Sequence, residues 1–137
     1  MIKEKSILIT TLLAVSVILL LAGCGAAEPE TAHTVESGAY QIEILAPGGE
    51  FRAGEISLII RAMRDGEIIE LDEGRLDLHM PAMGAMPRMD TGTGFTKSGV
   101  QLTGDIFFEM DGAWQGTLEL TTADGEAISE SIRVRVR

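Results

Sequence analysis

Four methionines gather within ten residues near the middle of the chain. Met80, Met83, Met86 and Met89 recur at every third position, and His79 comes directly before the first of them. Thioether sulfur is soft and uncharged, so it binds hard cations and zinc poorly but suits Cu(I). The segment therefore predicts a Cu(I) site made of two or three of these thioethers, with or without the imidazole of His79.

Geometry limits this prediction. In a straight polyproline II helix, residues three apart would lie about 9 Å apart along the axis. Sulfurs that share one metal ion must lie within about 4 Å of each other, because metal–sulfur bonds are about 2.3 Å long. The chain must therefore curl, either through a turn at Gly84 or through a short 3₁₀ turn. If residues 75–80 form a strand, its alternation points His79 away from Met80.

Two other interpretations of these methionines stay open. Methionine fills irregular gaps in hydrophobic cores, so the segment could instead cap one end of the domain. An exposed methionine-rich loop could also contact a partner protein. The ring of Trp114 could offer copper a cation–π contact, but we expect Trp114 and Met110 to be packing residues.

The residues after Gly38 alternate between apolar and polar side chains, as strands with one buried face do. Such apolar runs fall at residues 40–44, 56–60, 67–71, 75–80, 106–110, 114–120 and 132–136. Turn signals with glycine separate them, at Pro47-Gly48-Gly49, Asp65-Gly66, Glu73-Gly74, Asp111-Gly112 and Asp124-Gly125. We therefore predict an all-β domain over residues 38–137, an immunoglobulin-like antiparallel β-sandwich of about seven strands.

The last predicted strand carries arginine at alternate positions, Arg133, Arg135 and Arg137. We expect this charged face to point to water, where it could also protect a sheet edge from pairing with other chains.

The N-terminus is typical of an export signal. Lys3 and Lys5 precede an apolar run over residues 7–21, which is short for a bilayer crossing of about 20 residues and fits a signal-peptide core. Residues 21–24, Leu-Ala-Gly-Cys, resemble the lipobox of bacterial lipoproteins. The resemblance implies cleavage before Cys24 and a diacylglycerol on its thiol, and hence a lipid anchor in the cell membrane with the protein outside the cytoplasm.

This interpretation divides the chain into three parts. Residues 1–23 are the signal peptide, residues 24–37 are the lipidated Cys24 with a flexible tether, and residues 38–137 are the β domain. The tether is predicted because residues 25–37 are small, acidic and polar. We expect His33, which lies in it, to be solvated.

The composition excludes several functions. The chain has 137 residues with 11 basic and 21 acidic side chains, a net charge of −10, which argues against binding to nucleic acids because these require clustered lysines and arginines. Its single cysteine excludes an internal disulfide and a zinc cluster of thiolates. No motif of a hydrolase, metalloprotease or phosphate-binding loop occurs, and we predict that the protein is not an enzyme.

The order of motifs resembles the YtkA-like domain and the related FixH proteins. Residues 80–84 read Met-Pro-Ala-Met-Gly, and a glycine-rich linker, the apolar strand at 106–110, Gly112-x-Trp114 and a closing strand pair follow. The resemblance covers residues 38–137 and implies an immunoglobulin-type sandwich, secreted or attached to a membrane, that serves copper handling or cytochrome oxidase assembly. Members often carry histidine where this chain has Ala85, so Met86 and Met89 would have to compensate.

Two functions therefore remain open. The first is a membrane-anchored protein that binds Cu(I) and passes it by ligand exchange to a copper-receiving protein of the cell envelope. The second is a metal-free immunoglobulin-like module for adhesion or complex assembly.

Overall fold

The computed structural model describes residues 27–137, which form nine strands and no helix. The strands are β1 (Pro29–Ser37), β2 (Tyr40–Pro47), β3 (Gly54–Arg64), β4 (Glu67–Ile69), β5 (Leu71–Met80), β6 (Met89–Ser98), β7 (Gln101–Phe108), β8 (Gly112–Thr122) and β9 (Ala127–Val136). The all-β prediction is confirmed. The predicted signal peptide and the lipid on Cys24 lie outside the described residues. Within residues 27–137, no helix is long and apolar enough to cross a bilayer.

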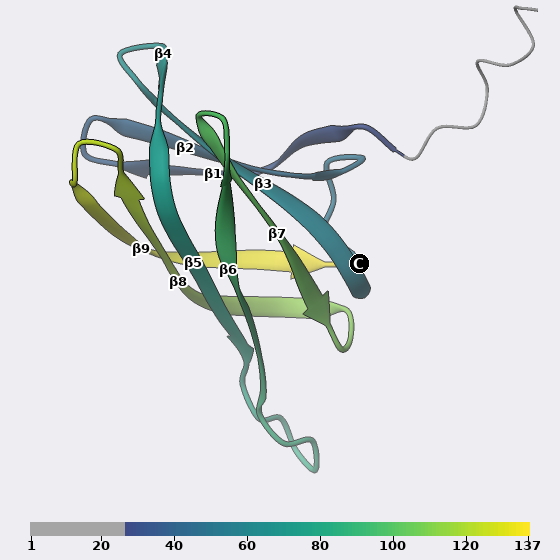
Figure 1. The fold of residues 1–137 in the computed structure, drawn as a ribbon. Coiled ribbons are helices and arrows are strands. Elements are labelled where there is room, and N and C mark those ends of the chain that lie inside the picture. The colour runs from purple at the N-terminus through teal and green to yellow at the C-terminus, as the bar shows by residue number, and fades with distance from the viewer. Residues whose placement is uncertain (1–26) are drawn as a thin grey trace, which may run out of the picture.

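The strands form one antiparallel path in the order β1-β2-β3-β7-β6-β5-β8-β9, and the short β4 pairs with β3 (Figure 1). β6 joins the two halves of this path, since Gly94 and Phe95 pair with β5 and Thr96–Ser98 pair with β7. The sheet nearly closes on itself. The amide of Arg137 donates to the carbonyl of Phe51 at 2.8 Å, and the amide of Ala53 donates to the carbonyl of Arg137 at 2.9 Å.

Nine strands exceed the predicted seven because two strands have little apolar sequence signal. The first is β1, which lies where the flexible tether was predicted. That prediction is wrong for Pro29–Ser37, which pair with β2 from end to end with one irregularity between Thr31 and His33, and which bury Val35. His33 is half-buried in β1, not solvated. The sheet partner orders this polar segment, whose own composition favours disorder.

The second unexpected strand is β6, where the sequence reads as a glycine-rich linker. One of its glycines serves close packing, since a Cβ atom on Gly92 would lie 2.6 Å from Oδ1 of Asp77. Gly74 behaves in the same way. It lies inside β5, not in the predicted turn, and a Cβ atom there would lie 2.7 Å from Leu102 Cδ1. The turn at Asp65-Gly66 is confirmed, with φ of 52° and 79° at its two residues, as a type I′ hairpin turn requires.

The core lies inside the curved sheet. All buried apolar side chains of the described part come from residues 35–136, so a fragment of residues 27–137 retains every core residue that the structure describes. Trp114 is at its centre with 0% exposure, and its ring meets that of Phe108 edge-on at 5.4 Å. The indole Nε1 donates to the carbonyl of Met110 at 3.2 Å. Trp114 and Met110 are thus packing residues, as expected from the sequence.

A substitution at Gly116 tests how closely β8 packs on β5. A Cβ atom on Gly116 would lie 1.8 Å from the carbonyl oxygen of Asp77, whereas one on Gly94 would meet nothing within 4 Å. We expect Gly116→Ala to lower the free energy of unfolding by more than about 2 kcal/mol, because a main-chain oxygen must move. The matched Gly94→Ala should leave it unchanged or raise it by up to about 1 kcal/mol. Urea unfolding followed by Trp114 fluorescence measures both, and equal midpoints would contradict the packing.

The burial of His33 predicts that the stability of the protein depends on pH. Burial lowers the pKa of His33 below its ordinary value of 6.5, so the unfolded chain takes up this proton at a higher pH than the folded one. The stability that neutral His33 contributes is therefore lost as the pH falls through 6.5. His33→Gln removes the effect, so we expect the variant to gain stability relative to the wild type between about pH 7.5 and about pH 5.5. Chemical denaturation across this range measures the difference, and a constant difference would refute the prediction.

Candidate metal-binding hairpin

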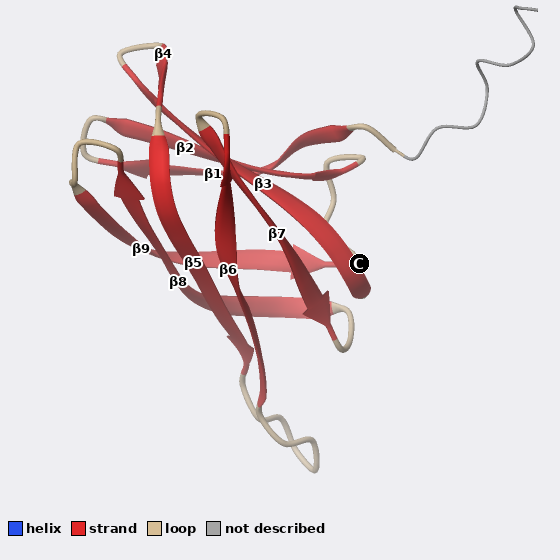
Figure 2. Ribbon diagram, viewed as in Figure 1, coloured by secondary structure: helices blue, strands red, loops and turns tan. Residues whose placement is uncertain are grey.

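The four methionines lie on the hairpin formed by β5 and β6. Met80 pairs with Met89 where the two strands end, and the same register continues beyond them to the tip, where Met83 pairs with Met86. The loop between the strands projects beyond the body of the domain (Figure 2). The methionines therefore form two cross-strand pairs, placed symmetrically about the central residues Gly84 and Ala85.

The tip is a tight turn held by two hydrogen bonds. The amide of Met83 donates to the carbonyl of Met86 at 3.1 Å, and the amide of Met86 donates to the carbonyl of Met83 at 2.9 Å. Gly84 has a φ of 58°, as at the first central position of a type II′ turn. Of the two ways in which the chain could curl, the structure has the turn at Gly84. Residues opposed in this way present their side chains on the same face, with Cα atoms about 5.5 Å apart.

The two pairs differ in exposure. Met83 and Met86 are 57% and 39% exposed, whereas Met80 is 3% exposed and Met89 is half-buried against the core. The end of the Met80 side chain lies against the start of β8, since a Cβ atom on Gly112 would be 2.7 Å from its Cε. The sequence presents four equivalent candidate ligands, but the structure brings together Met83 and Met86 at the surface and uses Met80 and Met89 to attach the hairpin to the core.

His79 lies on the outer face of β5. Its neighbours across the sheet are Asp90 on β6 and Gln115 on β8, and Gln115 Nε2 lies 3.3 Å from His79 Nε2. The amide oxygen of Gln115 accepts a hydrogen bond from Arg133 at 3.2 Å. Strand alternation continues to Met80, so the imidazole points away from the buried Met80 side chain, and a ligand role for His79 stays a prediction.

Charged side chains are absent from the tip itself. Residues 80–87 carry no charge, and the ion pair of Arg88 with Asp90, at 3.0 Å, lies at the base of the hairpin. Among residues 27–137, no three His, Cys, Asp or Glu side chains are grouped so that they could hold a metal ion. A cation at the tip would therefore meet thioethers and main-chain oxygens before any carboxylate, which favours a soft ion.

Comparison with known proteins adds nothing to this picture. No family model, no curated protein and no solved structure matches the chain. The likeness to the YtkA-like and FixH proteins rests on the sequence motifs and stays a prediction.

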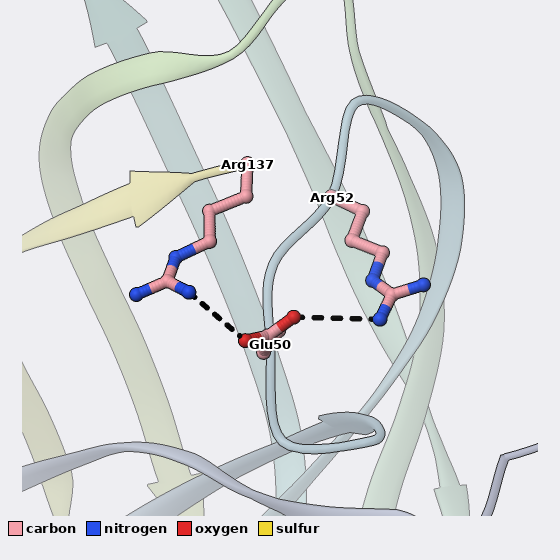
Figure 3. Close-up of polar contacts among 3 residues, drawn as sticks. All are labelled: Glu50, Arg52 and Arg137. Carbon is pink, nitrogen blue, oxygen red and sulfur yellow. Dashed lines mark hydrogen bonds and ion pairs between the residues drawn. The ribbon is translucent and has the colours of Figure 1, made fainter.

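Sequence reasoning could have found the paired methionines but not a second polar cluster. The signal for the pairs is their symmetrical spacing about Gly84-Ala85, which a two-residue turn converts into cross-strand neighbours. The second cluster joins Glu50 to Arg52 at 3.4 Å and to Arg137 at 3.2 Å (Figure 3). Glu50 and Arg52 are close in the sequence, but Arg137 lies 87 residues from Glu50, and no local pattern predicts that contact.

Oxidation tests whether the hairpin methionines differ in exposure as the structure shows. Because exposed thioethers react with peroxide faster than buried ones, we expect Met83 and Met86 to become sulfoxides well before Met80. Mass spectrometry of peptides from the briefly treated protein gives the rate at each site. The same measurement on the urea-unfolded chain is the control, since the rates should converge there. Equal rates for Met80 and Met83 in the folded protein would contradict the structure.

Proposed function

We propose that this protein is a membrane-anchored Cu(I)-binding protein whose metal site is the tip of the β5–β6 hairpin. The observation that carries the proposal is the pairing of Met83 with Met86 through two main-chain hydrogen bonds, since it presents two thioethers on one exposed face. Methionine has three rotatable side-chain bonds, so the two sulfurs can close on one ion without moving the main chain. Met80 and Met89 keep the hairpin in register and are not required as ligands.

The chemistry of the donors favours Cu(I) over other ions. Zinc, calcium and magnesium prefer imidazole, thiolate or oxygen ligands, and the tip offers none from side chains. The net charge of −10 supports capture, because a negative protein surface raises the local concentration of cations. Thioethers are neutral, so loading of the site requires no proton release.

The proposed role is delivery. A site of two exposed thioethers leaves coordination positions open, and a stronger histidine or cysteine site on a partner could enter there and take the ion by ligand exchange. The receiving protein would be a copper enzyme of the cell envelope or a respiratory oxidase during assembly, as the YtkA-like and FixH resemblance implies. Lipidation of Cys24 would hold the protein in the membrane outside the cytoplasm. The nearly closed antiparallel sheet is compatible with the immunoglobulin-like sandwich, which we retain as part of the proposal.

One observation favours a second function. Met83 is more exposed than any other large apolar side chain of the described part, and exposed methionines at a projecting tip also suit a protein contact. In that case the protein would be a metal-free interaction or assembly module of the cell envelope, and the tip would bind a partner without copper.

Anaerobic titration of residues 27–137 with Cu(I) against a competing chelator separates the two functions. We expect uptake of about one Cu(I) per chain and its loss in Met83→Leu/Met86→Leu, because leucine keeps the size of the side chain and removes the sulfur. The matched control is Met63→Leu/Met110→Leu, which makes the same change outside the hairpin and should keep uptake.

Either of two results would overturn the copper proposal: no uptake by the wild type, or equal uptake by Met83→Leu/Met86→Leu. The first result would favour the interaction module. Equal unfolding midpoints for the two double variants would show that a loss of uptake does not come from a loss of fold.

A further inference from the structure

A second site lies where the sheet nearly closes, and it shares no residue with the hairpin tip. A cavity of about 340 Å³ opens there between β1 and β9. It is lined by His33 of β1, Glu50 of the connection between β2 and β3, Arg133 and Arg135 of β9, and Arg137 directly after β9. We call this cavity the seam cavity.

The seam cavity concentrates positive charge in an acidic protein. Three of the chain's 11 lysines and arginines line it, against 21 acidic residues in the whole chain. Strand alternation explains their common direction, because Ile132, Val134 and Val136 fill the core and the arginines between them face outward. Among the described residues that line the cavity, Glu50 alone carries a carboxylate.

The polar contacts show which of these cations are free. Glu50 accepts from Arg137 at 3.2 Å and from Arg52 at 3.4 Å (Figure 3), so two guanidinium groups already neutralise its charge. Arg133 donates to the uncharged amide of Gln115, and Arg135 makes no hydrogen bond or ion pair with any described residue.

Apart from Arg64, the remaining cations of residues 27–137 all pair with carboxylates, unlike Arg133 and Arg135. Arg64 lies 5.6 Å from the centre of the Tyr40 ring. The others pair with carboxylates, and they are Arg52, Arg61, Arg75, Arg88 and Lys97. Two neighbouring arginines without a counter-charge are unexpected where carboxylates outnumber cations almost two to one.

We propose that the seam cavity binds a phosphate group through Arg133 and Arg135, with the imidazole of His33 as a further contact. Guanidinium forms paired hydrogen bonds with phosphate oxygens, and a phosphate ester carries one to two negative charges, which matches two uncompensated arginines.

The position of the cavity suggests two sources for the phosphate. The carbonyl of Glu28 accepts from the amide of Gly48 at 2.9 Å, so the chain enters β1 beside Gly49 and Glu50, at the cavity. Cys24 lies five residues before Pro29, a reach of at most about 18 Å. If Cys24 is lipidated as proposed, headgroup phosphates are within reach. A soluble phosphate ester offers the same chemistry, and the experiment must distinguish these sources.

The test uses the full chain in a nonionic detergent, with inorganic phosphate as the probe at constant ionic strength. NMR follows the Nε–Hε signals of the arginine side chains. We expect a saturable shift of the Arg133 and Arg135 signals, and an affinity about tenfold lower in Arg135→Gln. Arg75→Gln is the matched control, because it removes the same charge from an outward position on β5 and should leave the affinity unchanged.

Two results would overturn the site: no saturation by about 10 mM phosphate, or an equal loss of affinity in Arg135→Gln and Arg75→Gln. Two further arms identify the source once the site binds. A match between the Arg135 shift in nanodiscs containing phosphatidylglycerol and the shift at phosphate saturation assigns the site to a lipid headgroup. Binding of glycerol 3-phosphate without such a shift in nanodiscs assigns it to a soluble ester. Neither outcome depends on copper uptake, so this inference and the proposed function fail separately.

Discussion

The pairing register of β5 with β6 is the constraint on which the rest of the methionine segment depends. Leu76, Leu78 and Met80 face the core at alternate positions of β5, so a slip of one residue would turn all three outward. Core packing thus fixes the register at the base of the hairpin, and the turn at Gly84 carries the same register to the tip. Met83 and Met86 are therefore neighbours because the burial of apolar side chains at the base of the hairpin fixes its pairing register.

The difference in burial between the two methionine pairs explains how the segment combines a stable attachment with an exposed site. Met80 and Met89 are packed against the core and attach the hairpin to it, whereas Met83 and Met86 stay accessible beyond the body of the domain. The bend, which polyproline geometry forbids, comes from one glycine with positive φ. A soft-metal site at such a tip needs no cavity and no buried charge, which suits an ion that must arrive and leave.

Charge distinguishes the two candidate sites of this protein. The hairpin tip is uncharged within an acidic molecule, so its selectivity would come from the softness of sulfur and not from electrostatic strength. The seam cavity is the opposite case, a local excess of arginine on a surface that otherwise repels anions. An acidic body lacks general affinity for anionic lipids, so any contact with phosphate must come from a confined group of cations such as Arg133 and Arg135.

The sequence by itself determined the all-β class and the positions of most strands, because alternation of apolar residues is a local property of the chain. It also determined the soft-donor chemistry of residues 80–89, which depends on side-chain type alone. Only the tertiary structure decided that β1 and β6 are strands, because their own residues are polar or rich in glycine and the neighbouring strands order them. It also decided that Gly74 lies inside β5 and not in a turn, because the side chains that crowd it, Leu102 and Leu120, are distant in the sequence. It likewise decided which methionines are buried and brought Arg137 to Glu50, 87 residues away. Such contacts arise from the closure of the sheet, which no local pattern encodes.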